Sequence, residues 1–431
     1  MPEIKIALIG DVLVTHRLPT NNSGLSEISQ LFALHDCCIG NLETVVRNDE
    51  GYPEAFPGGG SCFCSPSCLK DLKELGFSMF STANNHSMDY GHGGLLATVK
   101  YLDELGIPHA GTGKNLAEAS KAAHYETAQG RIALVNVTSS FHDSYLAGPQ
   151  NQDVCGRPGV APLRHKALYT VPMEDYNHLR RIASLTGINS YHDQAIKEGY
   201  LGSSNYLKFS SLEFMGGVNY EVSTKPLDAD LSRTVAVIQD ASFESDIVVT
   251  SVHSHQFLGE KSVSPQFIEL FCRSCVDAGS KVVFCHGPHL LRGIEVYNGS
   301  VIFYGLGDFI LQHESMEYLP EEMYMKYGTS RSAMSGVQSL MQKRSDGGKK
   351  GLVASPDAWE SVIVSLSIDG AKTSVKLIPV RLSLHNAPKG LKGLPYLSSD
   401  ESTIRKIAQL SERYGTTIGL NGSTGFLEIR Q

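Results

Sequence analysis

The stretch that decides the fold is Phe80-Ser81-Thr82-Ala83-Asn84-Asn85-His86-Ser87-Met88-Asp89-Tyr90. It follows a short apolar run typical of a buried strand and precedes a helix that we expect over residues 93–105. In an α/β sheet, side chains that follow a strand lie at the edge where ligands bind. We therefore expect the Asn85 and His86 side chains to lie in a functional site.

Four other short stretches also come at the end of an apolar run. They are Gly10-Asp11, Asn41-Leu42-Glu43, His253-Ser254-His255 and His286-Gly287-Pro288-His289. Carboxylate, amide and imidazole groups are common ligands of divalent metals. Any one of these residues alone is more often structural, but their joint occurrence at successive strand ends predicts a metal site.

Strands and helices alternate along much of the chain, which predicts an α/β fold with layered sheets flanked by helices. We expect buried strands over 4–9, 77–82, 131–137, 246–252 and 281–284. Asn298-Gly299 and Gly216-Gly217 each stand between strand-like runs and predict hairpin turns.

The regularity of this pattern changes along the chain and suggests its divisions. Residues 1–312 form the expected main domain, and the looser pattern of 138–231 predicts an insertion that faces the substrate. The polar segment 313–356 predicts a helical insertion or lid. Residues 357–431, with two alternating strands and a helix over about 400–414, predict a C-terminal β/α extension that completes the fold.

The composition excludes several classes of protein. The 431 residues carry a net charge of −8 with interleaved signs, so no basic surface for nucleic acid is expected. No apolar run reaches the roughly 20 residues that a membrane helix needs. Met1 leads directly into a strand without a secretion signal, which predicts a cytoplasmic protein. Nine scattered cysteines predict reduced thiols rather than a disulfide framework.

At this point the sequence resembles a known family, the CapA group of poly-γ-glutamate capsule proteins, which have the calcineurin-like metallophosphoesterase fold. The resemblance spans Ile4 to about Ile310. It is carried by Gly10-Asp11, Asn41-Leu42-Glu43, Ala83-Asn84-Asn85-His86, Asp89, Gly111-Thr112-Gly113, Arg157-Pro158-Gly159-Val160, His253, Gly279, His286-Gly287-Pro288-His289 and Phe303-Tyr304-Gly305-Leu306-Gly307-Asp308-Phe309.

The resemblance implies a site with two divalent metal ions, for which Mn, Fe, Zn, Co and Ca are all compatible with oxygen and nitrogen ligands. It implies that Glu43 bridges the two ions and that His86 is a catalytic or substrate-binding imidazole. The implied metal ligands are Asp11, Glu43, Asn85, His253, His286 and His289.

The chain departs from the family pattern at several positions. Leu13 stands where the fold often has a histidine ligand, and His16 is a possible substitute. Gly287 replaces a histidine that is usual in the family. In the family, Trp-Gly usually follows the histidine that corresponds to His253. Here Ser254 and His255 follow it, so His255 adds an imidazole that is either a ligand or an acid/base group. Asp308 replaces an asparagine, and we expect it to cap a turn.

These features predict a metal-dependent hydrolase that cleaves a phosphoester or a peptide-like amide in a small-molecule or peptide substrate. One alternative is a metal-dependent peptide epimerase, in which His86 and His255 flank the Cα carbon as acid and base. Another is a non-catalytic protein of capsule assembly. A metal-free α/β protein is the remaining alternative, and the oligomeric state does not follow from the sequence.

Overall fold

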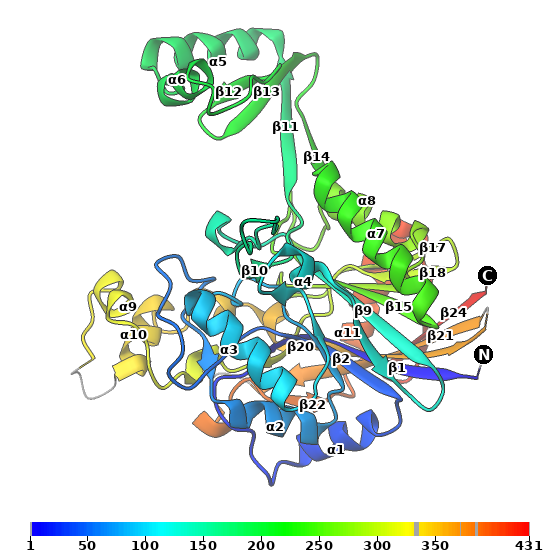
Figure 1. Cartoon of the computed structure of the whole chain (residues 1–431). Helices are drawn as coiled ribbons and strands as arrows, with labels where there is room; N and C mark the ends of the chain where they lie inside the picture. Colours follow the sequence, from blue (N-terminus) through cyan, green and yellow to red (C-terminus); the bar gives the residue numbers. More distant parts are fainter. Residues whose placement is uncertain (1, 332–335, 371, 384–386, 431) are drawn as a thin grey trace.

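The larger of two stacked β-sheets contains both the start and the end of the chain. The computed structural model describes residues 2–331, 336–370, 372–383 and 387–430 (Figure 1). The strands of this first sheet are β1 (Ile4–Leu13), β2 (Cys37–Leu42), β5 (Met79–Ser81), β6 (His109–Ala110), β19 (Asp308–Leu311), β20 (Glu360–Asp369), β21 (Lys372–Leu382), β22 (Pro395–Leu397), β23 (Gly419–Asn421) and β24 (Thr424–Arg430). Their order is β23-β24-β21-β20-β1-β2-β5-β6, with β19 beside β1 and β22 beside β21.

The second sheet contains six strands from the middle of the chain. They are β8 (Ala123–Glu126), β9 (Arg131–Thr138), β15 (Ile247–His253), β16 (Val282–His286), β17 (Ile294–Tyr297) and β18 (Ser300–Phe303), in the order β17-β18-β16-β15-β9-β8. The hairpin predicted at Asn298-Gly299 is confirmed as the antiparallel β17–β18 pair. Both turn residues have positive φ, 47° and 73°, as a tight hairpin turn requires.

Apolar side chains from both sheets meet in one core between them. Leu8 of β1 and Val364 of β20 belong to the same buried cluster as Leu134 of β9, Val249 of β15 and Phe284 of β16. Such a shared core is what two face-to-face sheets produce when alternate side chains point inward. The predicted layered α/β fold is therefore confirmed.

Helices cover the outer face of each sheet. Buried residues of α1 (Ser23–Phe32), α2 (Pro66–Leu75) and α3 (Gly91–Glu104) pack on the first sheet. Those of α4 (Leu116–Ser120), α7 (Asp228–Glu244) and α8 (Gln266–Asp277) pack on the second. Local chemistry sets the helix starts: the Asn22 side chain accepts a hydrogen bond from the Leu25 amide, and Pro66 occupies the first turn of α2.

Strand β1 is longer than the predicted strand 4–9, so Asp11 lies inside β1 instead of after it. The reason is a pairing that is distant in sequence, because β19 extends the first sheet beside the end of β1. The chain approaches closely here: a Cβ atom on Gly10 would lie 1.9 Å from the Gly307 carbonyl oxygen. Only glycine fits at position 10 without moving the backbone.

Residues 165–226 form a projection that we call the arm, drawn in green at the top of Figure 1. It contains β11 (His165–Pro172), α5 (Met173–Thr186), α6 (Ser190–Lys197), β12 (Leu207–Phe209), β13 (Leu212–Gly217) and β14 (Glu221–Pro226). Two long antiparallel strands, β11 and β14, connect it to the two stacked sheets and their helices, which we call the body.

The hairpin predicted at Gly216-Gly217 is wrong. The hairpin between β12 and β13 turns at residues 210–211, between the paired residues Phe209 and Leu212. Gly216-Gly217 instead ends β13, where it pairs in parallel with β11. A Cβ atom on Gly216 would lie 2.2 Å from the Met173 Sδ atom. This glycine therefore permits close packing against α5 and does not make a turn.

The segment after β19 packs beside the first sheet. It contains α9 (Glu321–Lys326) and α10 (Gly336–Arg344), whose buried residues form a separate apolar cluster with Leu13, Cys62 and Trp359. Residues 332–335 of the predicted insertion lie outside the described residues. The predicted terminal helix is present as α11 (Ser402–Ser411), and β20 and β21 correspond to the two predicted strands.

Candidate metal centre

The ends of strands from both sheets meet at one place. In the second sheet, His253 ends β15 and His286 ends β16, and the two residues are in register. In the first sheet, Asp11 of β1 is level with Asn41 of β2 on one side and Asp308 of β19 on the other. The stacked sheets thus bring carboxylates and imidazoles together from segments far apart in the sequence.

Asp11, His253 and His286 form a compact group whose donor atoms all lie within 4.8 Å of one another. The Asp11 Oδ1 atom is 2.9 Å from His286 Nδ1 and 3.5 Å from His253 Nδ1. Ser251 Oγ lies 2.8 Å from His286 Nε2, which leaves Nδ1 directed at Asp11. Asn41 donates a hydrogen bond of 2.7 Å to Asp11 Oδ1 and orients this carboxylate. Such supporting bonds are typical around metal ligands.

Glu43 is the clearest sign that a cation belongs here. Its side chain is fully buried, and neither carboxylate oxygen has a hydrogen-bond partner within the described part of the chain. Glu43 Oε1 lies 3.7 Å from His253 Nε2 and 4.0 Å from His255 Nε2. Asn85 Oδ1 lies 2.6 Å and 3.2 Å from the same two nitrogens. A buried unpaired carboxylate is costly, and a bound cation would remove that cost.

Asp308 and His289 form a third group with Asp11. The His289 Nδ1 atom is 2.9 Å and 3.0 Å from the two oxygens of Asp308, which is fully buried. The expectation that Asp308 caps a turn is wrong, because Asp308 begins β19 and its carboxylate faces an imidazole. His289 has a φ of 55°, a left-handed value that is uncommon for residues other than glycine.

We call these eight residues the strand-end cluster. They are Asp11, Glu43, Asn85, His253, His255, His286, His289 and Asp308. Oxygen and imidazole nitrogen in this mixture suit divalent transition metals and, for the oxygen-rich part, Ca²⁺. The residues present therefore fit the metals that the sequence predicted.

His86 is held in a separate group beside the strand-end cluster. Its Nδ1 atom is 2.6 Å from Asp89 Oδ2, and the Cys62 thiol contacts the same imidazole. Asp89 also accepts hydrogen bonds from the amides of Gly58 and Cys62, at 2.8 Å and 2.7 Å. The imidazole is therefore oriented by a carboxylate while its other edge faces the loop at Gly59.

Burial and neighbouring charges shift the pKa values of Asp11 and Glu43 in opposite directions. Burial opposes ionisation of Asp11, but His286 and His253 outweigh it and hold the pKa of Asp11 well below its usual range. Burial and then the Asp11 charge raise the pKa of Glu43 well above its usual range. Without a cation, the site thus disfavours a second negative charge beside Asp11.

The pKa values of His86 and His255 are also shifted in opposite directions. Burial disfavours the charged form of His86, but the Asp89 carboxylate outweighs it and raises the pKa of His86 well above its usual value. Burial, reinforced by His253, lowers the pKa of His255 well below its usual value. The shifts favour the charged form of His86 and the neutral form of His255.

The possible substitute ligand His16 is not part of the strand-end cluster. Its Nδ1 atom lies 3.2 Å from Thr15 Oγ1, and among the described residues it belongs to none of the candidate metal groups. Leu13, which stands at the usual histidine position, packs in the apolar cluster of the α9–α10 segment. The β1–β19 pairing instead places Asp308 beside Asp11.

Sequence reasoning assigned no role in the site to three residues near this centre. Asn41 and Asp308 could have been found, because each is a polar residue at the end of an apolar run. Nothing in the sequence, however, marked β19 as a neighbour of β1. His313 was placed in the following insertion, yet it is partly buried, and the charges of Arg344, His289 and His86 also oppose its protonation. Burial is the main reason that its pKa falls to about 3.

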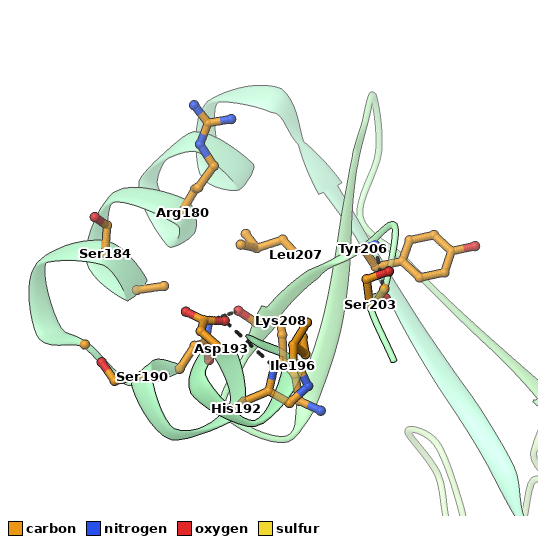
Figure 2. Close-up of a pocket in the computed structure, with 14 residues that line it drawn as sticks. Arg180, Ser184, Ser190, His192, Asp193, Ile196, Ser203, Tyr206, Leu207 and Lys208 are labelled. Carbon is orange, nitrogen blue, oxygen red and sulfur yellow. Dashed lines mark hydrogen bonds and ion pairs between the residues drawn. The ribbon is translucent and has the colours of Figure 1, made fainter. Parts of the chain in front are cut away.

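Two cavities differ in their relation to the strand-end cluster. One of about 510 Å³ is bordered by Asn85 and His255 and extends between residues 56–59 and 140–145. Another, of about 470 Å³, lies in the arm between α5, α6 and β12, with Arg180, Asp193 and Lys208 among its lining residues (Figure 2). None of the residues lining the arm cavity belongs to the strand-end cluster.

The stacked sheets with carboxylates and imidazoles at their strand ends define a layered α/β protein with a candidate metal centre. The chain belongs to the family of the bacterial capsule synthesis protein PGA_cap, whose family model matches residues 5–313. It is 32% identical to the uncharacterized protein y4sH of Sinorhizobium fredii over 98% of this chain and 92% of that protein.

More distant relatives have names that refer to capsule or polymer synthesis. The PGA biosynthesis protein CapA of Bacillus subtilis is 24% identical over 71% of this chain and 63% of its own length. A probable polyglutamine synthesis accessory protein of Mycobacterium tuberculosis is 25% identical over 70% of this chain and 63% of its own. The predicted CapA family membership is confirmed.

Helix length and polarity bear on the predicted lack of a membrane segment. Within the residues that the structure describes, none of the helices combines the length and apolar character needed to cross a bilayer. The cytoplasmic location stays a prediction.

Proposed function

We propose that this protein is a metal-dependent hydrolase whose catalytic centre is the strand-end cluster. The observation that carries the proposal is Glu43, a fully buried carboxylate with two unpartnered oxygens, enclosed by His253, His255 and Asn85. A fold gains nothing from such a group unless a cation binds it. The proposed main domain is residues 1–312, and it contains an insertion at 138–231. A second insertion at 313–356 follows, and the C-terminal extension, residues 357–431, completes the fold.

Two divalent ions would be held by the oxygens and imidazoles of the strand-end cluster. The groups that could hold them are Asp11 with His253 and His286, Asp11 with His289 and Asp308, and Glu43 with His253 and His255, and Asn85 Oδ1 lies beside the last two imidazoles. Divalent ions at this position would supply Lewis-acid catalysis and a nucleophile at neutral pH. Asn41 and Ser251 would keep the ligands oriented through their hydrogen bonds.

His86 has the position and the protonation to act on the substrate. Asp89 fixes its Nδ1 edge, so the opposite edge is directed toward the loop at Gly59 and the adjoining cavity. A charged imidazole there would stabilise negative charge on the substrate and donate a proton to the leaving group. The reaction would be cleavage of a phosphoester or a peptide-like amide.

The test measures metal and product together. Protein saturated with Mn²⁺, Zn²⁺ or Ca²⁺ would be assayed for bound metal and then incubated in heavy water with a panel of phosphoesters and peptides. We expect two equivalents of metal, and release of phosphate or of peptide fragments that depends on them. A protein that binds no divalent metal, or binds it without turning over any member of the panel, contradicts the proposal and favours a non-catalytic role.

Paired variants separate ligand from catalyst. Asn85→Ala should lower metal occupancy, because Asn85 Oδ1 lies between two imidazoles of the centre. His86→Ala should keep the metal and lose turnover by roughly 10²- to 10⁴-fold, the usual contribution of a general acid or base. Loss of metal from a correctly folded His86→Ala protein would mean that the two roles are assigned wrongly.

A second candidate is a metal-dependent peptide epimerase, and one observation favours it. His255 lines the cavity and the His86 imidazole faces Gly59, another lining residue, so two imidazoles would be available for acid/base chemistry with His255 free of the metal. In this reaction one imidazole would remove the Cα proton and the other would return a proton to the opposite face. Deuterium uptake at Cα without bond cleavage supports epimerisation, and cleaved product with unlabelled Cα excludes it.

A further inference from the structure

The cavity beside Asn85 and His255 is a built site with defined walls. On one side, residues 56–59 are tied to the main domain, because Asn85 Nδ2 donates a 2.6 Å hydrogen bond to the Gly58 carbonyl oxygen. The Gly58 amide in turn donates to Asp89. The opposite wall is formed by residues 140–142 and Tyr145. The loop position is therefore fixed by the same residues that orient the catalytic groups.

Aromatic side chains provide the faces of this cavity. The Phe56 ring stacks on His142 with 4.4 Å between the ring centroids and 5° between the planes. The buried Tyr145 hydroxyl donates a hydrogen bond to the Phe56 carbonyl oxygen. Phe56 lines the cavity and is 60% exposed, so part of this apolar residue stays open to solvent beside the His142 stack. A stacked and tethered ring of this kind is ready to bind another apolar group at little entropic cost.

The charge of the walls limits what the cavity can bind. None of the residues that line it is a lysine, arginine, aspartate or glutamate. Its most polar side chain, Gln256, is already used: Oε1 accepts from Ser139, Ser140 and Ser254, and Nε2 donates to the Ser139 carbonyl oxygen. The walls themselves therefore offer no side chain of opposite charge to an ionised group, and they favour an uncharged one.

We propose that this cavity is the subsite for an uncharged aromatic side chain of the substrate, adjacent to the bond or carbon atom on which the metal centre acts. The proposal rests on the proposed function, since it places the reacting group at Asn85 and His255. It defines the substrate class as a peptide-like molecule with an aromatic residue at the reacting position. The walls offer no lysine or arginine to a substrate that has a carboxylate on each unit.

Binding can be measured without turnover. Zn²⁺-loaded full-length protein would be titrated with N-acetyl-tryptophan amide and N-acetyl-glutamate amide, followed by ligand-observed NMR. We expect the aromatic amide to bind at least tenfold more tightly. Phe56→Ala should remove most of this preference, and because Phe56 is largely exposed the fold should be unaffected. Equal binding of the two amides, or an unchanged preference in Phe56→Ala, overturns the proposal.

Two further variants sharpen the test. Tyr52→Ala is the matched control. Tyr52 is an exposed aromatic residue that shortly precedes Phe56 in the sequence, and it does not line the cavity. It should keep the full preference. Phe141→Arg places a cation in the cavity wall and should shift the preference toward the glutamate amide; no shift in a folded Phe141→Arg protein counts against the subsite.

Failure of the subsite and failure of the proposed function give different results. Tight binding of the aromatic amide by a protein that turns over no substrate supports the subsite and refutes the hydrolase. Turnover that is indifferent to an aromatic group, measured as equal kcat/KM for peptides with tryptophan or glutamate at the reacting position, refutes the subsite and leaves the hydrolase in place.

Discussion

The two-sheet body and the arm bury very different amounts of their apolar side chains. The body has a continuous core in which residues such as Phe284 and Val249 are fully buried. In the arm, which is described throughout, α5 buries only Ala183 and α6 only Ala195, while Leu185 and Tyr191 are 75% and 88% exposed. The strand-end cluster lies in the body. The comparison indicates that stability and chemistry are concentrated there and that the arm depends on its two connecting strands.

The largest effect should follow removal of the buried charge at the centre of the body. Glu43→Gln keeps the shape of the side chain but replaces an anionic ligand by a neutral amide. Changes to residues that only support a metal ligand cost about 10–100-fold in metal affinity or activity, so loss of the proposed ligand Glu43 itself should cost at least that. Metal content and turnover would be measured together.

Glu104→Gln is the matched control for this substitution. Glu104 is an exposed residue of α3, and its ion pair with Lys100 is 3.8 Å long and open to solvent. Such surface pairs contribute little to stability. Metal content and turnover should therefore equal those of the unaltered protein; equal losses in both variants would show that the effect does not arise at the metal centre.

A pair of aromatic substitutions compares the packing of the two regions directly. Phe284→Ala opens a cavity between the sheets and should lower the free energy of unfolding by about 3–5 kcal/mol. Tyr191→Ala in α6 removes a ring that is mostly exposed and should change it by less than about 0.5 kcal/mol. Urea unfolding followed by circular dichroism measures both. A cost for Tyr191→Ala near that of Phe284→Ala would mean that the arm is covered in solution.

The same contrast explains which features could be predicted from the sequence. In the body, buried strands are apolar runs in the sequence, and the polar residues at their ends stand out. The structure brings three of these residues, His253, His286 and Asn85, close together. Short-range signals also succeeded, as at Asn298-Gly299, where two positive φ angles need those residue types.

Features that depend on pairing between distant segments could not be predicted. Asp308 reaches Asp11 only because β19 adds to the first sheet beside β1, nearly 300 residues away along the chain. No local pattern specifies that register. In the arm, half-buried strands and exposed apolar residues weaken the usual alternation, and Gly216-Gly217 was taken for a turn although it serves packing against α5.

The junction of the two regions should respond to pH. Asp230 of α7 is fully buried and accepts hydrogen bonds from the amide, Nε and Nη2 of Arg164, which precedes the arm, and from Arg233. Burial alone would raise the pKa of Asp230, but Arg164 and Arg233 outweigh it and lower the pKa. Asp230→Asn should cost about 2–3 kcal/mol at pH 7, less than a fully buried pair because the Arg164 side chain is partly exposed.

The sign of the pH effect follows from the direction of this shift. Because the pKa of Asp230 is lower in the folded than in the unfolded protein, its stabilisation is fully present above the unfolded value of about 4 and is lost as the pH falls through the folded value. The difference between the unaltered protein and Asp230→Asn should therefore shrink below about pH 4. A difference that stayed constant down to pH 3 would show that the carboxylate does not titrate in this way.

The smallest effect on the body should come from the largest change to the arm. Leu168 of β11 is paired with Ser223 of β14, so residues 169–222 can be replaced by an Asn-Gly turn that closes the two strands as a hairpin. The foot of the arm is kept, because Thr224 hydrogen bonds with Gln266 and Phe267 of α8. With no core residue of the body removed, the melting temperature and metal content should remain those of the full chain.

This excision also separates support from recognition. Since the cavity at Asn85 and His255 is formed entirely outside the arm, turnover of a small substrate should be unchanged. A selective loss with a large substrate would assign the arm, with its exposed rings and its own cavity, to binding of the distant part of that substrate (Figure 2). A truncated protein that failed to fold or lost its metal would break the comparison, because the arm would then be part of what holds the two sheets together.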